Sequence, residues 1–304
     1  MSRRIAVTGA SGFIGRHVTA HLAARGDQVA AVRRPFEPAA LREALRGAGA
    51  VVHLAGVVSA LRESDYVAAN VDGTRAVAAA ARAAGIPLIH ISSLAAAGPA
   101  SPRAPRSEDD PPAPINAYGR SKLDGERAVA AIDGLGWTTL RPGVVYGPGD
   151  RALLPVFRLA ARGILPLVGR VDAAYTFIHV ADLVRVIAAA VDHPPAGETM
   201  FVGHPQPVAT RDLLEGIRAA VGGRAAIVPI PLAVTRLAAF AGDAAGLLLC
   251  TRAVINSRRY AELASEGFVC RVERLRDRLG VVADIGLREG LADACAWYRQ
   301  EGWL

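Results

Sequence analysis

Tyr118 and Lys122 are the side chains in this sequence best suited to acid–base chemistry. They are four residues apart in a segment that is predicted to be helical, so they lie on one face, one turn from each other. A lysine ammonium beside a phenol lowers the pKa of the phenol, which lets a tyrosine act as an acid or base near neutral pH. The same spacing is also typical of a solvated helix face, so a second feature must support the chemistry.

Two serines supply that second feature. Ser92 and Ser93 end an apolar segment upstream of Tyr118, and this segment is typical of a buried parallel strand. Ligands bind beyond the carboxyl ends of such strands. A serine hydroxyl at this place can hold a substrate oxygen while Tyr118 transfers the proton.

A glycine-rich turn at the start of the chain predicts a site for a pyrophosphate. An apolar run at Arg4–Val7 precedes three evenly spaced glycines, Gly9, Gly12 and Gly15, and a helical stretch follows. The first glycine permits a tight turn, the second lets the backbone approach the phosphates, and the third lets the helix pack on the strand. The helix N-terminus adds unpaired N–H groups and a positive dipole end. Taken alone, the glycines also fit an ordinary turn between a strand and a helix.

Strands and helices alternate through the first half of the chain. Such alternation implies right-handed crossovers and a parallel sheet that is covered on both faces. We therefore predict an α/β fold with a doubly wound parallel sheet of the Rossmann type. The expected strands are Arg4–Val7, Gln28–Val32, Ala50–Leu54, Pro87–Ser92 and Trp137–Leu140, and the expected helices include Pro38–Leu45, Asp65–Ala84 and Tyr118–Ala131.

The pattern becomes irregular after about residue 150, where a smaller and mostly helical C-terminal lobe is expected. Residues 1–150 are predicted to form a dinucleotide-binding core, to which 176–202 return, and 151–175 with 203–304 a substrate-binding lobe. A proline-rich surface loop runs from Pro99 to Pro114. The expected later helices are Ala152–Arg162, Val180–Val191, Thr210–Val221 and Leu287–Gln300.

Composition limits the classes of partner. The formal net charge is +7, but basic and aromatic residues are not interleaved in any segment, so no nucleic acid is expected as a partner. The three cysteines lack metal-ligand spacing, which predicts no metal site and reduced thiols in a cytoplasm. They are Cys250, Cys270 and Cys295.

Neither a signal peptide nor a membrane span is expected. Met1–Arg4 leads directly into the first predicted strand and leaves no room for a signal peptide. The most apolar window, Pro231–Cys250, contains Arg236 and Asp243, so it is predicted to be a buried or lid helix.

These motifs belong to a larger set that extends nearly end to end. Together they resemble the extended short-chain dehydrogenase/reductase family, also called the NAD-dependent epimerase/dehydratase family. The resemblance implies hydride transfer between C4 of a nicotinamide and a carbonyl or alcohol carbon of a small molecule. The matching segments are Thr8–Gly15, His53–Gly56, Asn70–Thr74, Ser92–Gly98, Tyr118–Lys122, Arg141–Gly149, Phe177–Asp182, Glu289–Tyr298 and Gly302–Leu304.

The resemblance also assigns roles to residues. Tyr118 is expected to be the acid–base, and Lys122 to lower the tyrosine's pKa and hold the nicotinamide ribose. Ser93, five residues before Gly98, matches the catalytic serine, and Ser92 is its structural neighbour. His179 and Asp182 are expected to be structural. The expected cofactor contacts are Gly9, Ser11, Gly12, Phe13, Ile14, Gly15, Arg33, Arg34, Leu54, Ala55, Gly56, Asn70, Tyr118, Lys122, Pro142 and Val145.

The second predicted strand departs from the family pattern. Members that prefer NAD usually end it with an acidic residue that binds the ribose, whereas this chain has Arg33 and Arg34. Arginines at this place suit a 2′-phosphate, so NADP is favoured and NAD is the alternative. The segment from Arg34 to Ala50 is short, which predicts that the third strand, at the sheet edge, is missing.

The substrate side also departs from the family's sugar-nucleotide members. Tyr175 stands where they carry an arginine that binds a diphosphate, and Pro142–Val144 lacks their asparagine. These changes favour a reductase or dehydrogenase with an apolar substrate, in contact with Ser93, Val144 and Tyr175. Because Arg151, Arg158 or Arg170 could still bind a diphosphate, a nucleotide-sugar epimerase or dehydratase stays open as the alternative.

Two further expectations concern catalysis and assembly. A cofactor-sensing protein without catalytic activity is a third hypothesis, and the intact Ser93, Tyr118 and Lys122 argue against it. The helices Asp65–Ala84 and Tyr118–Ala131 resemble the pair that forms the four-helix interface of family dimers, so a homodimer is expected. The alternative is that their apolar faces pack only on the sheet.

Overall fold

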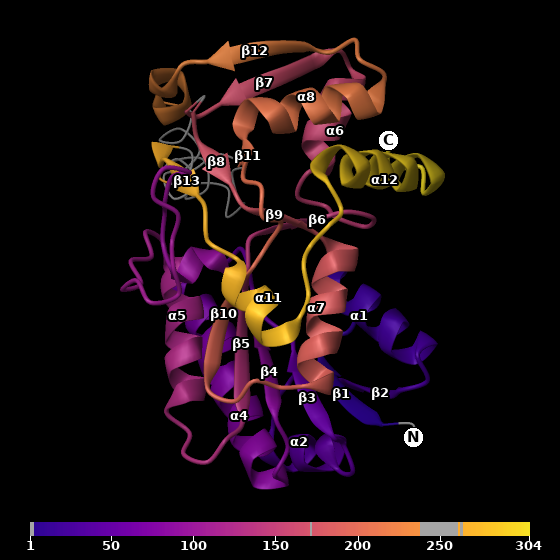
Figure 1. Cartoon of the computed structure of the whole chain (residues 1–304), viewed down its shortest axis with the longest axis vertical. Helices are drawn as coiled ribbons and strands as arrows, with labels where there is room; N and C mark the ends of the chain where they lie inside the picture. The colour runs from indigo at the N-terminus through magenta and orange to yellow at the C-terminus, as the bar shows by residue number, and fades with distance from the viewer. Residues whose placement is uncertain (1–2, 171, 238–260, 262–263) are drawn as a thin grey trace.

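A six-stranded parallel sheet forms the core of the larger lobe (Figure 1). The structure, a computed structural model, describes residues 3–170, 172–237, 261 and 264–304. Every neighbouring pair of strands is parallel, in the order β10-β5-β4-β3-β1-β2. The predicted doubly wound sheet is thereby confirmed. Its strands are β1 (Arg4–Thr8), β2 (Gln28–Val32), β3 (Ala50–His53), β4 (Leu88–Ile91), β5 (Trp137–Pro142) and β10 (Glu198–Val202).

Helices cover both faces of this sheet. Successive residues of a strand point to opposite faces, so Ile5 and Val7 of β1 pack toward one layer of helices and Ala6 packs toward the other. Figure 1 shows the two layers on either side of the sheet. One layer is α1 (Phe13–Ala24) and α7 (Val180–Asp192), and the other is α2 (Pro38–Leu45), α4 (Gly73–Ala84) and α5 (Ala117–Ala130).

The predicted loss of the third strand is confirmed. β2 lies at the end of the sheet and, among the described residues, pairs only with β1. The chain passes from β2 directly into α2, and Phe36 in the connection packs against the core between them. An edge strand forms fewer contacts than a central one, so its loss leaves the order of the other strands intact.

The helix predicted over Asp65–Ala84 is continuous but not uniform. It consists of α3 (Glu63–Tyr66), a π-helical turn η1 (Val67–Asp72) and α4. A π turn inserts an extra residue without changing the apolar pattern enough to be visible in the sequence, and such turns are frequent at functional sites. Here the π turn contains Asn70, one of the predicted site residues.

The C-terminal lobe is helical, as predicted, but it also contains small sheets that were not predicted. Its helices α6 (Leu154–Ala161), α8 (Thr210–Val221) and α12 (Leu287–Gln300) enclose an apolar cluster that includes Phe157 and Tyr298. In the three-stranded sheet each strand has only two residues, too few to show alternation, which is why the sequence did not reveal that sheet. The strands are β7 (Ile164–Val168) with β12 (Ala226–Ile230), and β8 (Ala174–Tyr175) with β11 (Val208–Ala209) and β13 (Gly267–Phe268).

The two lobes are joined by short parallel segments. β6 (Val144–Tyr146) continues from β5 and pairs with β9 (Phe177–His179), which leads into α7. α11 (Glu273–Leu279) returns from the upper lobe to pack beside α7 and β10 (Figure 1). Residues from both lobes therefore meet beyond the carboxyl ends of β4 and β5.

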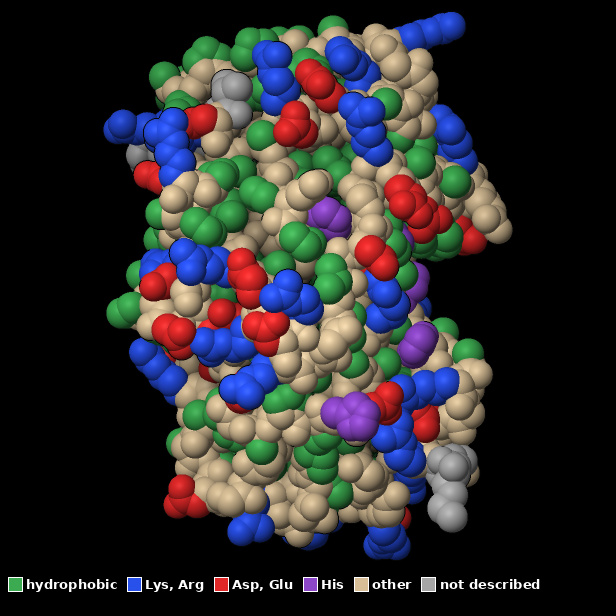
Figure 2. All heavy atoms as spheres, viewed as in Figure 1, with side chains coloured by type: hydrophobic (Ala, Val, Ile, Leu, Met, Phe, Trp, Pro, Cys, Tyr) green, Lys and Arg blue, Asp and Glu red, His purple; other side chains and the backbone are tan. Residues whose placement is uncertain are grey.

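The face of the molecule displayed in Figure 2 carries mixed charge. Figure 2 shows Lys and Arg side chains interspersed with Asp and Glu across the displayed face, rather than gathered into one basic patch. No helix in the described ranges is long and apolar enough to cross a membrane. Cys250 and the greater part of the predicted Pro231–Cys250 helix lie outside the described residues.

Candidate active site

The glycine turn forms a close backbone contact between β1 and β3. Gly9 has a φ of +70°, and a Cβ atom at this position would lie 2.8 Å from the Ala55 nitrogen. A Cβ atom at Gly15 would lie 2.1 Å from the Gly9 carbonyl oxygen, so only glycine fits at either place. Gly12 precedes α1, whose N-terminus has no side-chain cap and no acidic residue in its first turn. This cradle fits a pyrophosphate.

Tyr118 is placed by the start of α5. Asn116 caps the helix, because its Oδ1 accepts a hydrogen bond of 2.7 Å from the Gly119 N–H. A Cβ atom at Gly119 would lie 2.4 Å from the Ala95 carbonyl oxygen, so this glycine lets α5 approach the segment after β4. Sequence reasoning missed the role of Gly119, although it is part of the motif that contains Tyr118.

The two serines have different environments. Ser92 is buried, and its hydroxyl donates a hydrogen bond to Glu126. Ser93 is half-buried, and its Oγ accepts a bond of 3.2 Å from the Ala95 N–H at the start of the short helix η2 (Leu94–Ala96). Because the Ser93 hydroxyl accepts this bond, its own hydrogen stays available for a substrate oxygen.

Lys122 is buried next to the end of β4, which leads into Ser92 and Ser93. Its Nζ donates a hydrogen bond of 2.7 Å to the Ile91 carbonyl oxygen at the end of β4. Burial lowers the pKa of Lys122 to about 8, against the opposing charge of Glu126. Nζ lies 3.8 Å from where a Cβ of Gly56 would be, so the predicted cofactor segment Leu54–Gly56 comes close to the ammonium.

Asn70 connects the segment that contains Leu54–Gly56 to α5 by hydrogen bonds. Its side chain exchanges two hydrogen bonds with the backbone of Val57, of 2.8 and 3.0 Å, and its Nδ2 also donates 2.9 Å to the Ser121 Oγ. The Ser121 hydroxyl in turn donates 2.8 Å to the Tyr118 carbonyl oxygen. The structure therefore connects Asn70 and Tyr118, and Ser121 is a link that sequence reasoning missed.

A buried ion pair supports the back of the site. Arg141 donates two hydrogen bonds to Glu126, of 2.9 Å from Nε and 2.6 Å from Nη2, and both side chains are 8% exposed. The same carboxylate accepts from Ser92, so one group fixes α5 against β4 and β5. Sequence reasoning missed Glu126. Its position four residues after Lys122, on the same helix face, was the available signal.

The predicted substrate residues lie where the lobes meet. Val144 donates its N–H to the Thr176 carbonyl oxygen at 2.8 Å, which places it beside Tyr175. The Tyr175 ring stacks on Phe268, with 6.4 Å between ring centroids. Val145 instead packs into the core of the larger lobe, near the end of β5 at Pro142.

The two arginines emerge beside the glycine turn but away from Tyr118. Val32 pairs with Thr8, so Arg33 and Arg34 follow β2 at the same sheet edge as the turn. Both are exposed, and neither forms an ion pair within the described ranges. The Arg34 guanidinium lies 6.0 Å from the centre of the Phe36 ring.

Comparison with known proteins identifies the family. The model of the NAD dependent epimerase/dehydratase family matches residues 5–203. The chain belongs to this family. It is therefore an NAD(P)-dependent enzyme, as the motifs predicted, in a family that includes both reductases and epimerases. The matched region ends beyond β10 and contains the glycine turn, Ser93 and the Tyr118–Lys122 pair.

Individual relatives extend the match to the whole chain. A ceramide reductase of Caulobacter vibrioides is 30% identical over 99% of this chain and 96% of its own. A 4-hydroxy-2-methyl-3-oxo-4-farnesyl-3,4-dihydroquinoline-1-oxide ketoreductase of Stigmatella aurantiaca is 29% identical over 95% of this chain and 94% of its own. The solved structure of MoeE5 with UDP-glucuronic acid and NAD has a TM-score of 0.79 at 26% identity, covering 98% and 99% of the two chains.

Proposed function

We propose that this protein is an NADP-dependent reductase of a ketone or aldehyde group in a substrate with a long apolar part. The observation that carries the proposal is the apolar surface around Tyr118. Val58, Leu61 and Ile115 are exposed by 72, 54 and 38%. Val57 and Ala60, beside the first two of these residues, pack in one cluster with Tyr118, and Ile115 precedes the tyrosine by three residues. Large apolar side chains on the rim of a polar site suit an apolar ligand.

The proposed substrate class agrees with the relatives. The ceramide reductase and the farnesyl-dihydroquinoline ketoreductase carry names that describe substrates with long hydrocarbon chains. On the other side of the site, Tyr175 and Phe268 add a stacked aromatic pair. A nucleotide diphosphate would need paired positive charge in the same place, because buried phosphates without partners are very costly.

The arrangement assigns one step to each side chain. The Ser93 hydroxyl donates a hydrogen bond to the substrate carbonyl oxygen, since its oxygen accepts from the Ala95 N–H and its hydrogen is left to donate. Tyr118 transfers its proton to that oxygen, and the Lys122 ammonium stabilises the phenolate that remains. When it is bound, the nicotinamide cofactor supplies the hydride for the carbonyl carbon. The uncapped α1 N-terminus and Gly9 hold its pyrophosphate.

The substrate class can be tested by binding and turnover. Oxidation of NADPH should be fast with long-chain 3-oxo compounds and slow with short ketones, as measured by the absorbance of the reduced nicotinamide. We expect UDP, dTDP and GDP to bind more weakly than about 1 mM, above the weak end of typical substrate constants. Calorimetry on the cofactor-loaded protein measures this. Micromolar binding of any of the three would put the alternative function first.

That alternative is a nucleotide-sugar epimerase or dehydratase. Its support is the match over nearly the whole chain to MoeE5, which was solved with UDP-glucuronic acid and NAD. An epimerase regenerates its own cofactor and retains it tightly. Mass spectrometry of the purified protein would show retained oxidised cofactor in that case, whereas a reductase exchanges its cofactor with solution.

The preference for NADP follows from Arg33 and Arg34. Changing both to serine should weaken NADPH binding by about 1.5–3 kcal/mol, the range for lost charge-assisted hydrogen bonds to a phosphate, with a smaller effect on NADH. Titration of both cofactors against both proteins measures the difference. Arg42→Ser, at an exposed arginine on α2, is the matched control. A wild-type protein that binds NADH more tightly than NADPH would contradict the preference.

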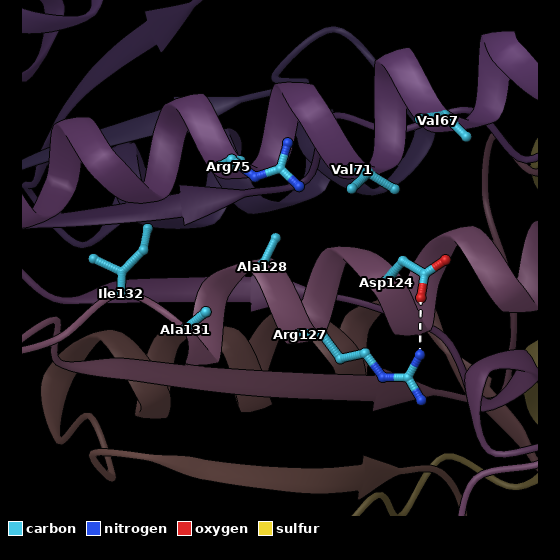
Figure 3. A pocket seen from close by; sticks show the side chains of 8 residues that line it. All are labelled: Val67, Val71, Arg75, Asp124, Arg127, Ala128, Ala131 and Ile132. Carbon is cyan, nitrogen blue, oxygen red and sulfur yellow. Dashed lines mark hydrogen bonds and ion pairs between the residues drawn. The ribbon is translucent and has the colours of Figure 1, made fainter.

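A homodimer is proposed on the face of η1, α4 and α5. A surface pocket there has an apolar floor between charged side chains, and Val67 at its rim is 46% exposed (Figure 3). The small alanines of α5 permit close approach of helices from a second copy. The pocket is lined by Val67, Val71, Arg75, Asp124, Arg127, Ala128, Ala131 and Ile132.

Light scattering at micromolar concentration should give twice the chain mass, and Val67→Glu should halve it by placing a charge in the apolar contact. Val282→Glu, at another exposed valine, is the control and should leave the mass unchanged. A monomer for the unmodified protein would exclude this interface.

We also propose a cytoplasmic location, which the free thiols of Cys270 and Cys295 support.

A further inference from the structure

A line of buried hydrogen bonds crosses the larger lobe beneath the site. The ring of His53, at the end of β3, lies between two threonine hydroxyls, with Nδ1 at 2.7 Å from the Thr8 Oγ1 and Nε2 at 3.0 Å from the Thr74 Oγ1. All three side chains are at most 1% exposed. Buried polar groups of this kind determine a unique arrangement only when every member is paired.

The neighbouring bonds determine the direction of each hydrogen bond. The Thr74 hydroxyl donates 2.8 Å to the Asn70 carbonyl oxygen, so it must accept from a hydrogen on the His53 Nε2. In a neutral ring the His53 Nδ1 then has no hydrogen and accepts from the Thr8 hydroxyl, whose hydrogen would otherwise be buried without an acceptor. The Thr8 Oγ1 accepts in turn from the Ala55 N–H at 3.2 Å. Only a neutral imidazole with its hydrogen on Nε2 satisfies the whole line.

The surroundings of the ring favour this neutral form. Burial, together with the smaller effect of the positive charges of Lys122 and Arg34, lowers the pKa of His53 to about 3. The ring of His90 stacks on His53 at 5.6 Å, and its pKa is also lowered by burial. Both rings are therefore neutral at neutral pH.

The two ends of the line reach the two halves of the site. At one end, the hydrogen bond from the Ala55 N–H to the Thr8 hydroxyl fixes the backbone of Ala55, which is in close contact with Gly9 of the pyrophosphate turn. At the other end, Asn70 connects through Ser121 to the Tyr118 carbonyl oxygen. The His53 side chain joins these two arms.

We propose that His53 is a positioning residue that aligns the pyrophosphate turn with the catalytic helix α5. Its Nδ1 arm, through Thr8, sets the turn and so the affinity for the cofactor. Its Nε2 arm, through Thr74 and Asn70, sets the place of Tyr118 and so the rate of the chemical step. This inference rests on the proposed function only in the assignment of Tyr118 as the acid–base.

Two threonine variants separate the arms. Thr74→Val keeps the shape of the side chain but breaks the Nε2 arm, so kcat should fall about tenfold while the cofactor Kd stays within about threefold. Thr8→Val breaks the Nδ1 arm, so the cofactor Kd should rise about tenfold while kcat at saturating cofactor stays within about threefold. Thr74→Ser restores the hydroxyl and should restore kcat.

Thr139→Val is the matched control. Thr139 is a fully buried threonine of β5, and its hydroxyl has no hydrogen-bond partner within the described residues. The same substitution there should leave both kcat and cofactor Kd unchanged. If Thr74→Val lowered only the melting temperature and kept the kcat of Thr139→Val, with active sites counted by titration, the positioning role would be overturned.

The tautomer supplies a readout that does not depend on activity. Nitrogen NMR of the full chain, assigned with a His53→Gln variant, should show a neutral His53 ring with its hydrogen on Nε2. A charged ring at pH 6, or a hydrogen on Nδ1, would overturn the proposal. If Tyr118 proves dispensable for turnover, the proposed function fails, while the tautomer and the cofactor affinity of Thr8→Val still test the line itself.

Discussion

Replacement of Tyr118 by phenylalanine should abolish turnover and leave cofactor affinity within about tenfold of the unmodified protein, because only the group that transfers the proton is removed. The ring keeps its place, since α5 is held by the Asn116 cap and by the bond from Ser121 to the backbone. Steady-state rates with an identified carbonyl substrate, together with a cofactor titration, measure the two quantities.

Tyr66→Phe is the control for this change. The Tyr66 ring lies 6.3 Å from the Tyr118 ring, and its hydroxyl makes one long hydrogen bond of 3.4 Å to the Val58 carbonyl oxygen. Loss of the Tyr66 hydroxyl should change kcat by less than about threefold, since no charge develops at the Tyr66 oxygen during the reaction. Turnover of Tyr118→Phe within tenfold of the unmodified protein would contradict the assignment of Tyr118.

The largest effect on stability is expected at Glu126. Its replacement by alanine leaves the Arg141 guanidinium buried without a counter-ion, which should lower the free energy of unfolding by about 3–5 kcal/mol. The Ser92 hydroxyl loses its acceptor in the same variant. Chemical denaturation in the absence of cofactor measures the change.

Two comparisons make this result specific. Glu43→Ala breaks an ion pair with Arg46 in which both side chains are exposed, so it should cost less than about 1 kcal/mol. The double variant Glu126→Leu, Arg141→Met removes both charges and should recover a large part of the loss. A loss below about 1 kcal/mol for Glu126→Ala alone would show that the pair is not the support we describe.

The sequence revealed those parts of the fold that depend on local chemistry. The glycine turn, the alternation of strands and helices in the first half of the chain and the missing third strand were predicted because each has a local signature of spacing or length. The short β8 and the π turn at Asn70 were not predicted, since two-residue strands and one inserted residue leave almost no periodic signal.

The candidate site divides in the same way. Ser93, Tyr118 and Lys122 stand in recognisable motifs, so their residue types and spacing indicated a common role. The partners that hold them were not visible, because Glu126 meets Arg141 and Asn70 meets Ser121 only after distant segments pack together. Residue spacing within one helix can suggest a supporting residue such as Glu126, but the donor that it meets on another strand depends on the tertiary structure.

The burial of Lys122 has a consequence for the energetics of the whole molecule. In the unfolded chain its ammonium is solvated, with a pKa of 10.5, whereas in the folded chain the pKa is about 8. The folded state therefore binds this proton less strongly than the unfolded chain does. At neutral pH this difference lowers the free energy of unfolding by about 3 kcal/mol, relative to a molecule with a neutral side chain at the same place. That deficit is complete below pH 8 and disappears as the pH rises toward 10.5. The protein thus operates in the protonation state that favours its own unfolding, and fold stability is lost in exchange for a buried cation at the proposed reacting centre.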